Sequence, residues 1–73
     1  MRPQSSMIDV REMLCAQALA LVAQALGRVE IGSLLGVRYG SDDVRQDLVV
    51  WARDRGHGVL ETGERTLQLT RRR

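Results

Sequence analysis

The side chain with the clearest chemical potential in this sequence is Cys15, the only cysteine among 73 residues. It lies where the polar segment 9–12 gives way to a helical run that begins at Leu14. A thiol in the first turn of a helix is close to backbone N–H groups without helical partners and to the positive end of the helix dipole. Both features stabilise a thiolate. Cys15 is therefore a candidate nucleophile.

The alternative for Cys15 is a structural role, because free cysteine is among the side chains most often buried. The polar residues before it favour exposure, and the pattern alone leaves the two interpretations open. A single cysteine cannot close a disulfide within the chain. This composition is unlike that of small secreted domains with several disulfides, and it fits a reducing, cytoplasmic compartment.

The other residues with ligating or catalytic side chains receive structural interpretations. His57, the only histidine, follows Gly56 at the end of a predicted helix, whereas Cys15 begins an earlier one. The two would lie at opposite ends of the layer, too far apart for a Cys–His pair. Asp42 and Asp43 are adjacent, do not face each other and suit the positive end of a helix. We expect no metal and no cofactor, since one Cys and one His fall short of a zinc site.

The charged residues exclude some chemistry and leave one cluster unexplained. All eleven basic residues are arginine and the formal net charge is +2, so lysine chemistry such as Schiff-base formation is excluded. Arg11, near Cys15, is either a source of positive potential at a docking surface or a salt-bridged residue. Arg71, Arg72 and Arg73 have no acidic neighbours in sequence, and we interpret them as a solvated tail. RNA contact by this tail is the weaker alternative, because no aromatic platform accompanies it.

The apolar segment 14–26 has to be compared with targeting and membrane segments. Gln17 and Gln24 interrupt it, and Asp9 and Glu12 precede it, which is unlike a signal peptide. It is also shorter than the ~20 residues that span a bilayer. We therefore expect a soluble, cytoplasmic protein without membrane contact.

Hydrophobic spacing predicts two helices. The first covers residues 13–26 and stops at Gly27, since glycine commonly follows the last helical residue. Its apolar and polar residues fall on opposite sides: Leu14, Ala18, Leu21, Val22 and Ala25 against Gln17, Gln24 and Arg28. The second runs from Asp42, with a cap at Ser41 or Asp42, to Arg55, and Gly56 ends it. Its apolar face is Val44, Leu48, Trp51 and Ala52, with Trp51 as a core anchor.

Alternating hydropathy predicts four strands, at residues 7–10, 34–39, 58–62 and 66–70. In the second strand Leu35, Val37 and Tyr39 share one face. The last two strands form a hairpin with its turn at Gly63 and Glu64.

The element order βαβαββ predicts an α+β fold, because a strand, helix and strand in succession usually form a parallel crossover. We expect a two-layer α/β sandwich in which two helices cover one face of a mixed four-stranded sheet. The other face would be open to solvent or a partner. Residues 7–71 form the single domain, after a disordered leader at 1–6 and before a frayed basic tail at 72–73. We expect a monomer.

A series of motifs in the same order extends over nearly the whole predicted domain: Ile8-Asp9-Val10-Arg11, Leu14-Cys15, Gly32, Ser41-Asp42-Asp43, Asp47-Leu48, Trp51-Ala52 and Gly56-His57. In order and spacing, residues 7–71 resemble the TusA (SirA-like) sulfur-carrier family. In that family the cysteine belongs to a Cys-Pro-x-Pro motif and carries sulfur as a persulfide. The resemblance implies that Cys15 is the sulfur-bearing residue.

The chain departs from the family at the motif itself, which reads Cys15-Ala16-Gln17-Ala18. Alanine retains the helix but restores the N–H groups that proline lacks. We expect the N–H groups of Ala16 and Ala18 to point at a Cys15 thiolate or at the terminal sulfur of a persulfide, and to lower the thiol pKa further. The alternative is that the lost rigidity marks a relative that has drifted from sulfur relay.

The resemblance implies a small carrier that relays persulfide sulfur from a donor such as a cysteine desulfurase to an acceptor protein. In relatives the sulfur ends in tRNA thiolation or in molybdenum-cofactor metabolism, and the transfer step follows thiol–disulfide exchange chemistry. A second class of function stays open. This is a thiol-independent regulatory or interaction module that binds protein or RNA through the open sheet face and residues 71–73.

Overall fold

The chain folds in the predicted order βαβαββ. The computed structural model describes residues 5–73. Its elements are β1 (Ser5–Asp9), α1 (Cys15–Arg28), β2 (Leu34–Arg38), α2 (Asp42–Asp54), β3 (Gly58–Gly63) and β4 (Thr66–Thr70). Neither helix has the length and apolar character that a membrane crossing requires.

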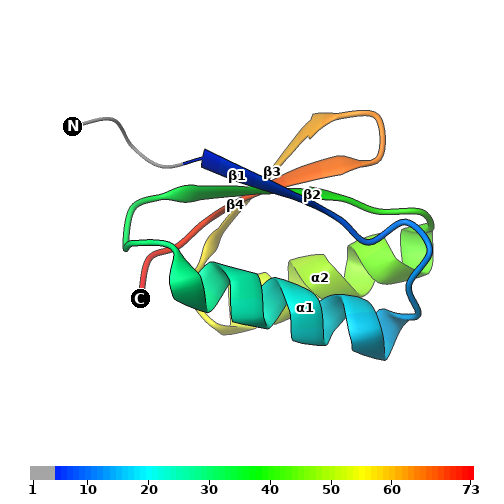
Figure 1. The fold of residues 1–73 in the computed structure, drawn as a ribbon, viewed down its shortest axis with the longest axis horizontal. Coiled ribbons are helices and arrows are strands. Elements are labelled where there is room, and N and C mark those ends of the chain that lie inside the picture. Colours follow the sequence, from blue (N-terminus) through cyan, green and yellow to red (C-terminus); the bar gives the residue numbers. More distant parts are fainter. Residues whose placement is uncertain (1–4) are drawn as a thin grey trace.

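The four strands form one mixed sheet in the order β1-β2-β4-β3. β1 is parallel to β2, whereas β4 is antiparallel to both of its neighbours, β2 and β3. Both helices lie on the same side of this sheet, and both begin at the same end of the layer (Figure 1). The predicted α+β class and mixed four-stranded sheet are confirmed.

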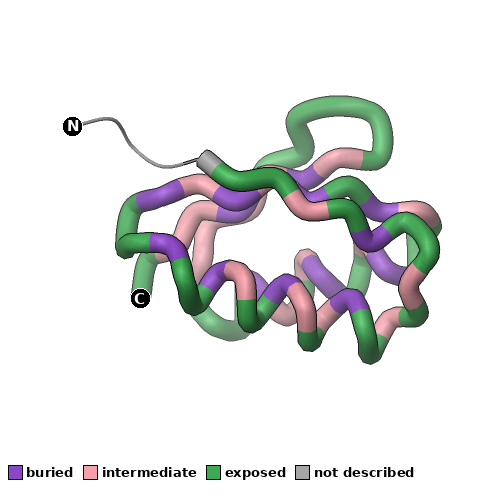
Figure 2. Tube along the Cα trace, viewed as in Figure 1, coloured by how far each residue is buried: buried purple, intermediate pink, exposed green. Residues whose placement is uncertain are grey.

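The core lies between the sheet and the helices, where the buried positions of the two layers face one another (Figure 2). The sheet contributes Leu35, Val37, Leu67 and Leu69, and Tyr39 lies just beyond β2. The helices contribute Ala18, Val22, Leu26, Val44, Leu48 and Ala52. These positions follow the predicted periods of two in strands and of three to four in helices. The predicted core face of β2 is therefore confirmed.

The first strand begins earlier than the hydropathy pattern predicts. Ser5 pairs with Leu34 and Ser6 with Leu35, so β1 includes two residues expected in the leader. Parallel pairing with β2 satisfies backbone groups whatever the side chains are, which is why two serines extend the strand. The remainder of the predicted leader, residues 1–4, lies outside the described residues.

The first helix continues past the glycine that was expected to stop it. Gly27 keeps a helical position, and α1 ends one residue later, at Arg28. Its φ is not positive, so Gly27 does not take the left-handed conformation of a glycine stop. The Arg71 guanidinium instead donates to the carbonyl oxygens of Gly27 and Val29 at this end. The prediction of a stop at Gly27 was wrong because a residue from the end of the sheet supplies the cap.

The second helix ends at the predicted glycine. Gly56 has a φ of 80°, its N–H donates to the Arg53 carbonyl over 3.0 Å, and the His57 N–H donates to the Ala52 carbonyl over 2.9 Å. This pair of bonds is the Schellman arrangement, which requires a left-handed residue at the position of Gly56. The expected role of His57 as the residue that follows the helix is confirmed.

The hairpin turn is one residue later than predicted. Gly63 is the last residue of β3, and the turn consists of Glu64 and Arg65. Arg65 has a φ of 55°, which is uncommon for a residue other than glycine. Two contacts hold it there: the Tyr39 N–H donates to its carbonyl oxygen over 3.0 Å, and its guanidinium donates to the Gly40 carbonyl.

Candidate functional site

Residues 10–14 form a short segment that packs against the end of β2 and leads into α1, which begins at Cys15. The Val10 N–H donates to the Arg38 carbonyl over 2.9 Å, and the Met13 N–H donates to the Val10 carbonyl over 3.1 Å. The Arg11 backbone lies against Gly40, where a Cβ atom would overlap the Arg11 carbonyl oxygen. A glycine at position 40 is therefore what allows residues 10–14 to turn so closely beneath the sheet.

Arg11 is held by the residue that ends β1. Its guanidinium lies 2.8 Å from Asp9 Oδ2, and its backbone N–H donates to Asp9 Oδ1 over 3.0 Å. This partner lowers the pKa of Asp9 through hydrogen bonds and charge. Of the two interpretations of Arg11, the structure shows the salt-bridged one, so its charge is largely balanced within the chain.

Cys15 is the first residue of α1 and is partly exposed. Its side chain packs at the margin of the hydrophobic core, while the preceding Leu14 is 74% exposed. The thiol is therefore neither sealed in the core nor fully projected into solvent. A reagent or a partner can reach it from the end of the layer where both helices begin.

The backbone donors near Cys15 are used differently from the expectation. The Ala18 N–H donates to the Leu14 carbonyl over 2.8 Å as the first hydrogen bond of α1, so it does not face the sulfur. The Leu14 N–H is satisfied by Oε1 of Gln17 at 3.2 Å. The prediction that Ala18 would contribute a donor to a thiolate was wrong, because the helix itself uses that N–H.

The pKa of the Cys15 thiol is raised, contrary to the expected lowering. The largest cause is the interaction of the thiol with the nearby Asp47 carboxylate, which favours the protonated form, followed by burial and by the negative charges of Asp47 and Asp43. A backbone hydrogen bond at Cys15 itself acts in the opposite direction but is the smallest influence. Because α1 and α2 begin at the same end of the layer, the acidic side of α2 faces the thiol and outweighs the α1 dipole.

Beyond Asp47, an open groove of about 440 Å³ runs along α2, with Leu19 of α1 in its lining. It is lined by Leu19, Gln46, Asp47, Val50, Trp51 and Asp54. Val50 is 60% exposed there. The groove therefore combines apolar side chains with carboxylates, and it shares Asp47 with the surroundings of the thiol.

His57 lies at the other end of the helical layer. It shares a cavity with Leu26 and Gly27, at the end of α1, about three turns and roughly 17 Å along the helix from Cys15. The expectation that these two side chains form no catalytic pair agrees with this placement. Trp51 is near His57, with 5.9 Å between ring centroids, and it is only partly buried. The most buried aromatic ring is that of Tyr39, 6% exposed, so Trp51 lies at the core margin and is not the anchor that its spacing predicted.

The acidic residues at the start of α2 have structural roles. Asp42 and Asp43 occupy its first turn, and the Ser41 hydroxyl accepts the Val44 N–H over 3.4 Å as the cap. Within residues 5–73 no three histidine, cysteine, aspartate or glutamate side chains are grouped so that they would hold a metal ion.

Comparison with known proteins finds no matching family model, no similar curated protein and no similar solved structure. The site is therefore interpreted from its own geometry. Sequence reasoning singled out Cys15 but not the influence of Asp47 on it. The available signal was the spacing of Asp43 and Asp47, which places both carboxylates on one side of α2.

Proposed function

We propose that the protein is a sulfur carrier that holds persulfide sulfur on Cys15 and passes it to an acceptor protein. The observation that carries the proposal is the placement of the only thiol. It is partly exposed at the first residue of α1, with exposed Leu14 beside it. The βαβαββ order and the motifs shared with TusA-like carriers support the same assignment. Such chemistry belongs in a reducing compartment, which agrees with a cytoplasmic location.

The transfer consists of two displacements. The Cys15 thiolate attacks the outer sulfur of a donor persulfide, a new S–S bond forms on Cys15, and the donor leaves as a thiolate. An acceptor thiolate then attacks the outer sulfur on Cys15, which leaves as a thiolate in turn. No oxidant is consumed in either step. No second cysteine in the sequence can attack the persulfide and release its sulfur prematurely.

In this proposal, Asp47 controls the reactivity of Cys15 through the pKa of the thiol. Its carboxylate raises the pKa of the Cys15 thiol and so disfavours the thiolate, which is the form that attacks sulfur. The first displacement therefore begins with loss of the thiol proton to solvent or to Asp47. A donor that brings positive charge close to Asp43 and Asp47 would weaken their effect and favour the thiolate. Reactivity would then depend on docking of the correct partner.

The surroundings of Cys15 suit a partner with an apolar centre and basic margins. Leu14 and Val50 are 74% and 60% exposed, and Asp43, Asp47 and Asp54 supply negative charge along α2. Complementary charge of this kind guides encounter and selects partners more than it adds affinity.

The experiment is incubation with a small-molecule persulfide followed by intact-mass measurement. We expect a gain of about 32 Da that a phosphine reductant removes, and no gain in Cys15→Ser. The reductant is necessary because a sulfinic acid has nearly the same mass and resists reduction. A protein that gains no reducible sulfur at any donor concentration, or gains it equally in Cys15→Ser, contradicts the proposal.

A further inference from the structure

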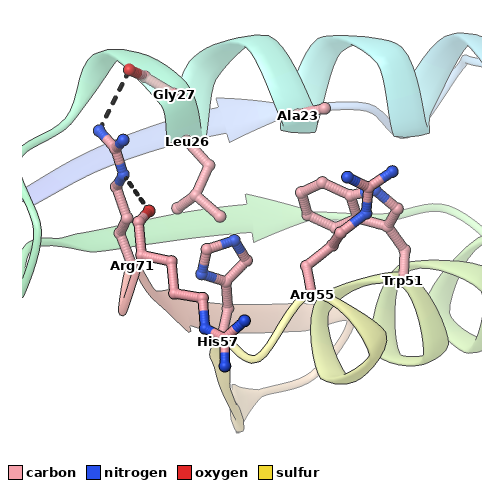
Figure 3. Close-up of a pocket in the computed structure, with 8 residues that line it drawn as sticks. Ala23, Leu26, Gly27, Trp51, Arg55, His57 and Arg71 are labelled. Carbon is pink, nitrogen blue, oxygen red and sulfur yellow. Dashed lines mark hydrogen bonds between the residues drawn. The ribbon is translucent and has the colours of Figure 1, made fainter.

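A second cavity, of about 120 Å³, lies at the end of the molecule opposite Cys15, and its lining includes three arginines and a histidine (Figure 3). Its principal lining residues are Arg55, His57, Arg71, Arg73, Trp51 and Leu26, here called the arginine pocket. These side chains come from the ends of both helices, from the turn before β3 and from the segment after β4. No aspartate or glutamate side chain lines the pocket within the described residues.

Arg71 is fixed in place by its own hydrogen bonds. Its Nε donates to the Arg73 carbonyl over 2.7 Å, and Nη1 donates to the carbonyls of Gly27 and Val29. Its backbone is also held, since the Arg71 N–H donates to the Ser33 carbonyl over 3.0 Å. A guanidinium carries five N–H donors, so the two on Nη2 are left for a ligand. Arg71 thus lines the pocket in a fixed orientation, and the two N–H groups on Nη2 have no partner among the described residues.

His57 contributes a directed donor. Its Nδ1 accepts the Arg72 N–H over 3.2 Å, so the neutral imidazole carries its proton on Nε2. The ring extends from the turn after α2 toward Leu26 (Figure 3). Burial, followed by the positive charges of Arg71, Arg73 and Arg55, lowers the pKa of His57.

The negative ends of the two helix dipoles do not balance the charge of the three arginines that line the pocket. Both helices end here, and each contributes the equivalent of about half a negative charge. Two helix ends therefore balance about one guanidinium, whereas three line the pocket. None of the salt bridges within residues 5–73 involves Arg55, Arg71 or Arg73. The printed chain ends at Arg73, whose main-chain oxygen accepts from Arg71 Nε, and a terminal carboxylate there balances a second guanidinium. Roughly one positive charge then remains without a partner in the described part of the chain.

We propose that the arginine pocket binds a phosphoryl group. Its volume of about 120 Å³ is sufficient for one tetrahedral oxyanion. Arginine donors are well suited to the oxygens of phosphate, and the His57 Nε2–H adds a fourth side chain. The group is either free phosphate or a phosphate of a longer molecule, such as an RNA backbone, whose remainder stays outside.

The pocket is independent of the sulfur-transfer proposal, because it lies about three helical turns from Cys15. Trp51 is the one residue that lines both this pocket and the groove along α2, and neither Asp43 nor Asp47 lines the pocket. The pocket also revises the interpretation of residues 71–73 as a solvated tail. Arg71 and Arg73 line a defined cavity, and the Arg72 backbone is bonded to His57. Phosphate binding would therefore persist in Cys15→Ser.

The test is titration with inorganic phosphate at constant ionic strength, followed through the single histidine and the single tryptophan. We expect saturable changes in the His57 imidazole NMR signals and in Trp51 fluorescence, since the rings are 5.9 Å apart. Bound phosphate should also raise the pKa of His57, because a dianion beside it offsets the field of Arg55, Arg71 and Arg73. A short single-stranded RNA in a parallel titration distinguishes a backbone phosphate from free phosphate.

The variant Arg55→Gln should weaken binding at least tenfold, and Arg73→Gln should act in the same direction. The matched control is Arg53→Gln, which removes the same charge from the last turn of α2 without touching the pocket. Equal weakening in all three variants would show diffuse charge attraction and overturn the proposal. It is also overturned if neither phosphate nor RNA changes the His57 and Trp51 signals of the folded wild-type protein.

Discussion

Replacing Gly40 by alanine tests whether the close packing of residues 10–14 against Gly40 positions Cys15. The added Cβ atom would overlap the Arg11 carbonyl oxygen and lie 3.1 Å and 3.2 Å from the Arg11 carbonyl carbon and Cα. All three atoms belong to the backbone, so no side-chain rotation relieves the overlap. Residues 10–14 must therefore move away from the end of β2.

Overpacking of this kind costs about 1–3 kcal/mol. In a domain of this size each kcal/mol lowers the melting temperature by roughly 4–8 °C. Gly40→Ala is thus expected to melt at least about 4 °C below the wild type, as measured by circular dichroism. Because the displaced segment leads directly into α1, the rate of Cys15 alkylation should change in the same variant.

Gly27→Ala is the matched control, since no atom lies within 4 Å of the position its Cβ would occupy. Gly27 lies in α1 without a positive φ, so alanine should stabilise the protein by about 0.5–1 kcal/mol. The reasoning is refuted if Gly40→Ala melts within about 1 °C of the wild type, or if both variants lose stability equally.

Three further predictions follow from the cap and the thiol. Ser41→Ala removes the hydroxyl that accepts the Val44 N–H and should cost about 1 kcal/mol in urea unfolding; an unchanged midpoint would show that the cap contributes nothing. Asp47→Asn should move the pH midpoint of Cys15 alkylation downward and speed the reaction at neutral pH, and an unmoved midpoint would exclude Asp47 as the main cause of the raised pKa. The folded state binds the Cys15 proton more tightly than the unfolded chain, so this contribution to stability is complete below pH 9.0 and is lost as pH rises through the higher folded pKa. Cys15→Ser should therefore lose less stability than the wild type at alkaline pH, and parallel losses would contradict the raised pKa.

The sequence correctly predicted the features that follow from local patterns, namely the buried face of a strand and the glycine that ends a helix. Leu35, Val37 and Tyr39 alternate as a half-buried strand must, and all three are buried. Gly56 ends α2 because the left-handed conformation it adopts is open to glycine and rare for other residues. These features depend on neighbours along the chain, which is why they can be read locally.

Features that depend on contacts between distant segments were missed. Gly27 was assigned as a helix stop because its actual cap, Arg71, lies 44 residues away in sequence. The Cys15 pKa was expected to fall because the α1 dipole is local, whereas Asp47 approaches only after α2 has packed beside α1. The basic residues 71–73 were assigned to a solvated tail or its margin because nothing nearby in sequence shows that Arg71 and Arg73 meet His57 around one cavity.

The central claim is that Cys15 both accepts and releases sulfur, and onward transfer measures this most directly. Protein loaded with persulfide and freed of donor would be mixed with an acceptor protein that carries a single reduced thiol. The expected result is loss of about 32 Da from this protein and an equal gain on the acceptor, with Cys15 returned to its thiol form. A Cys15 that never becomes loaded, or whose sulfur leaves only when a phosphine reductant is added, would contradict the claim.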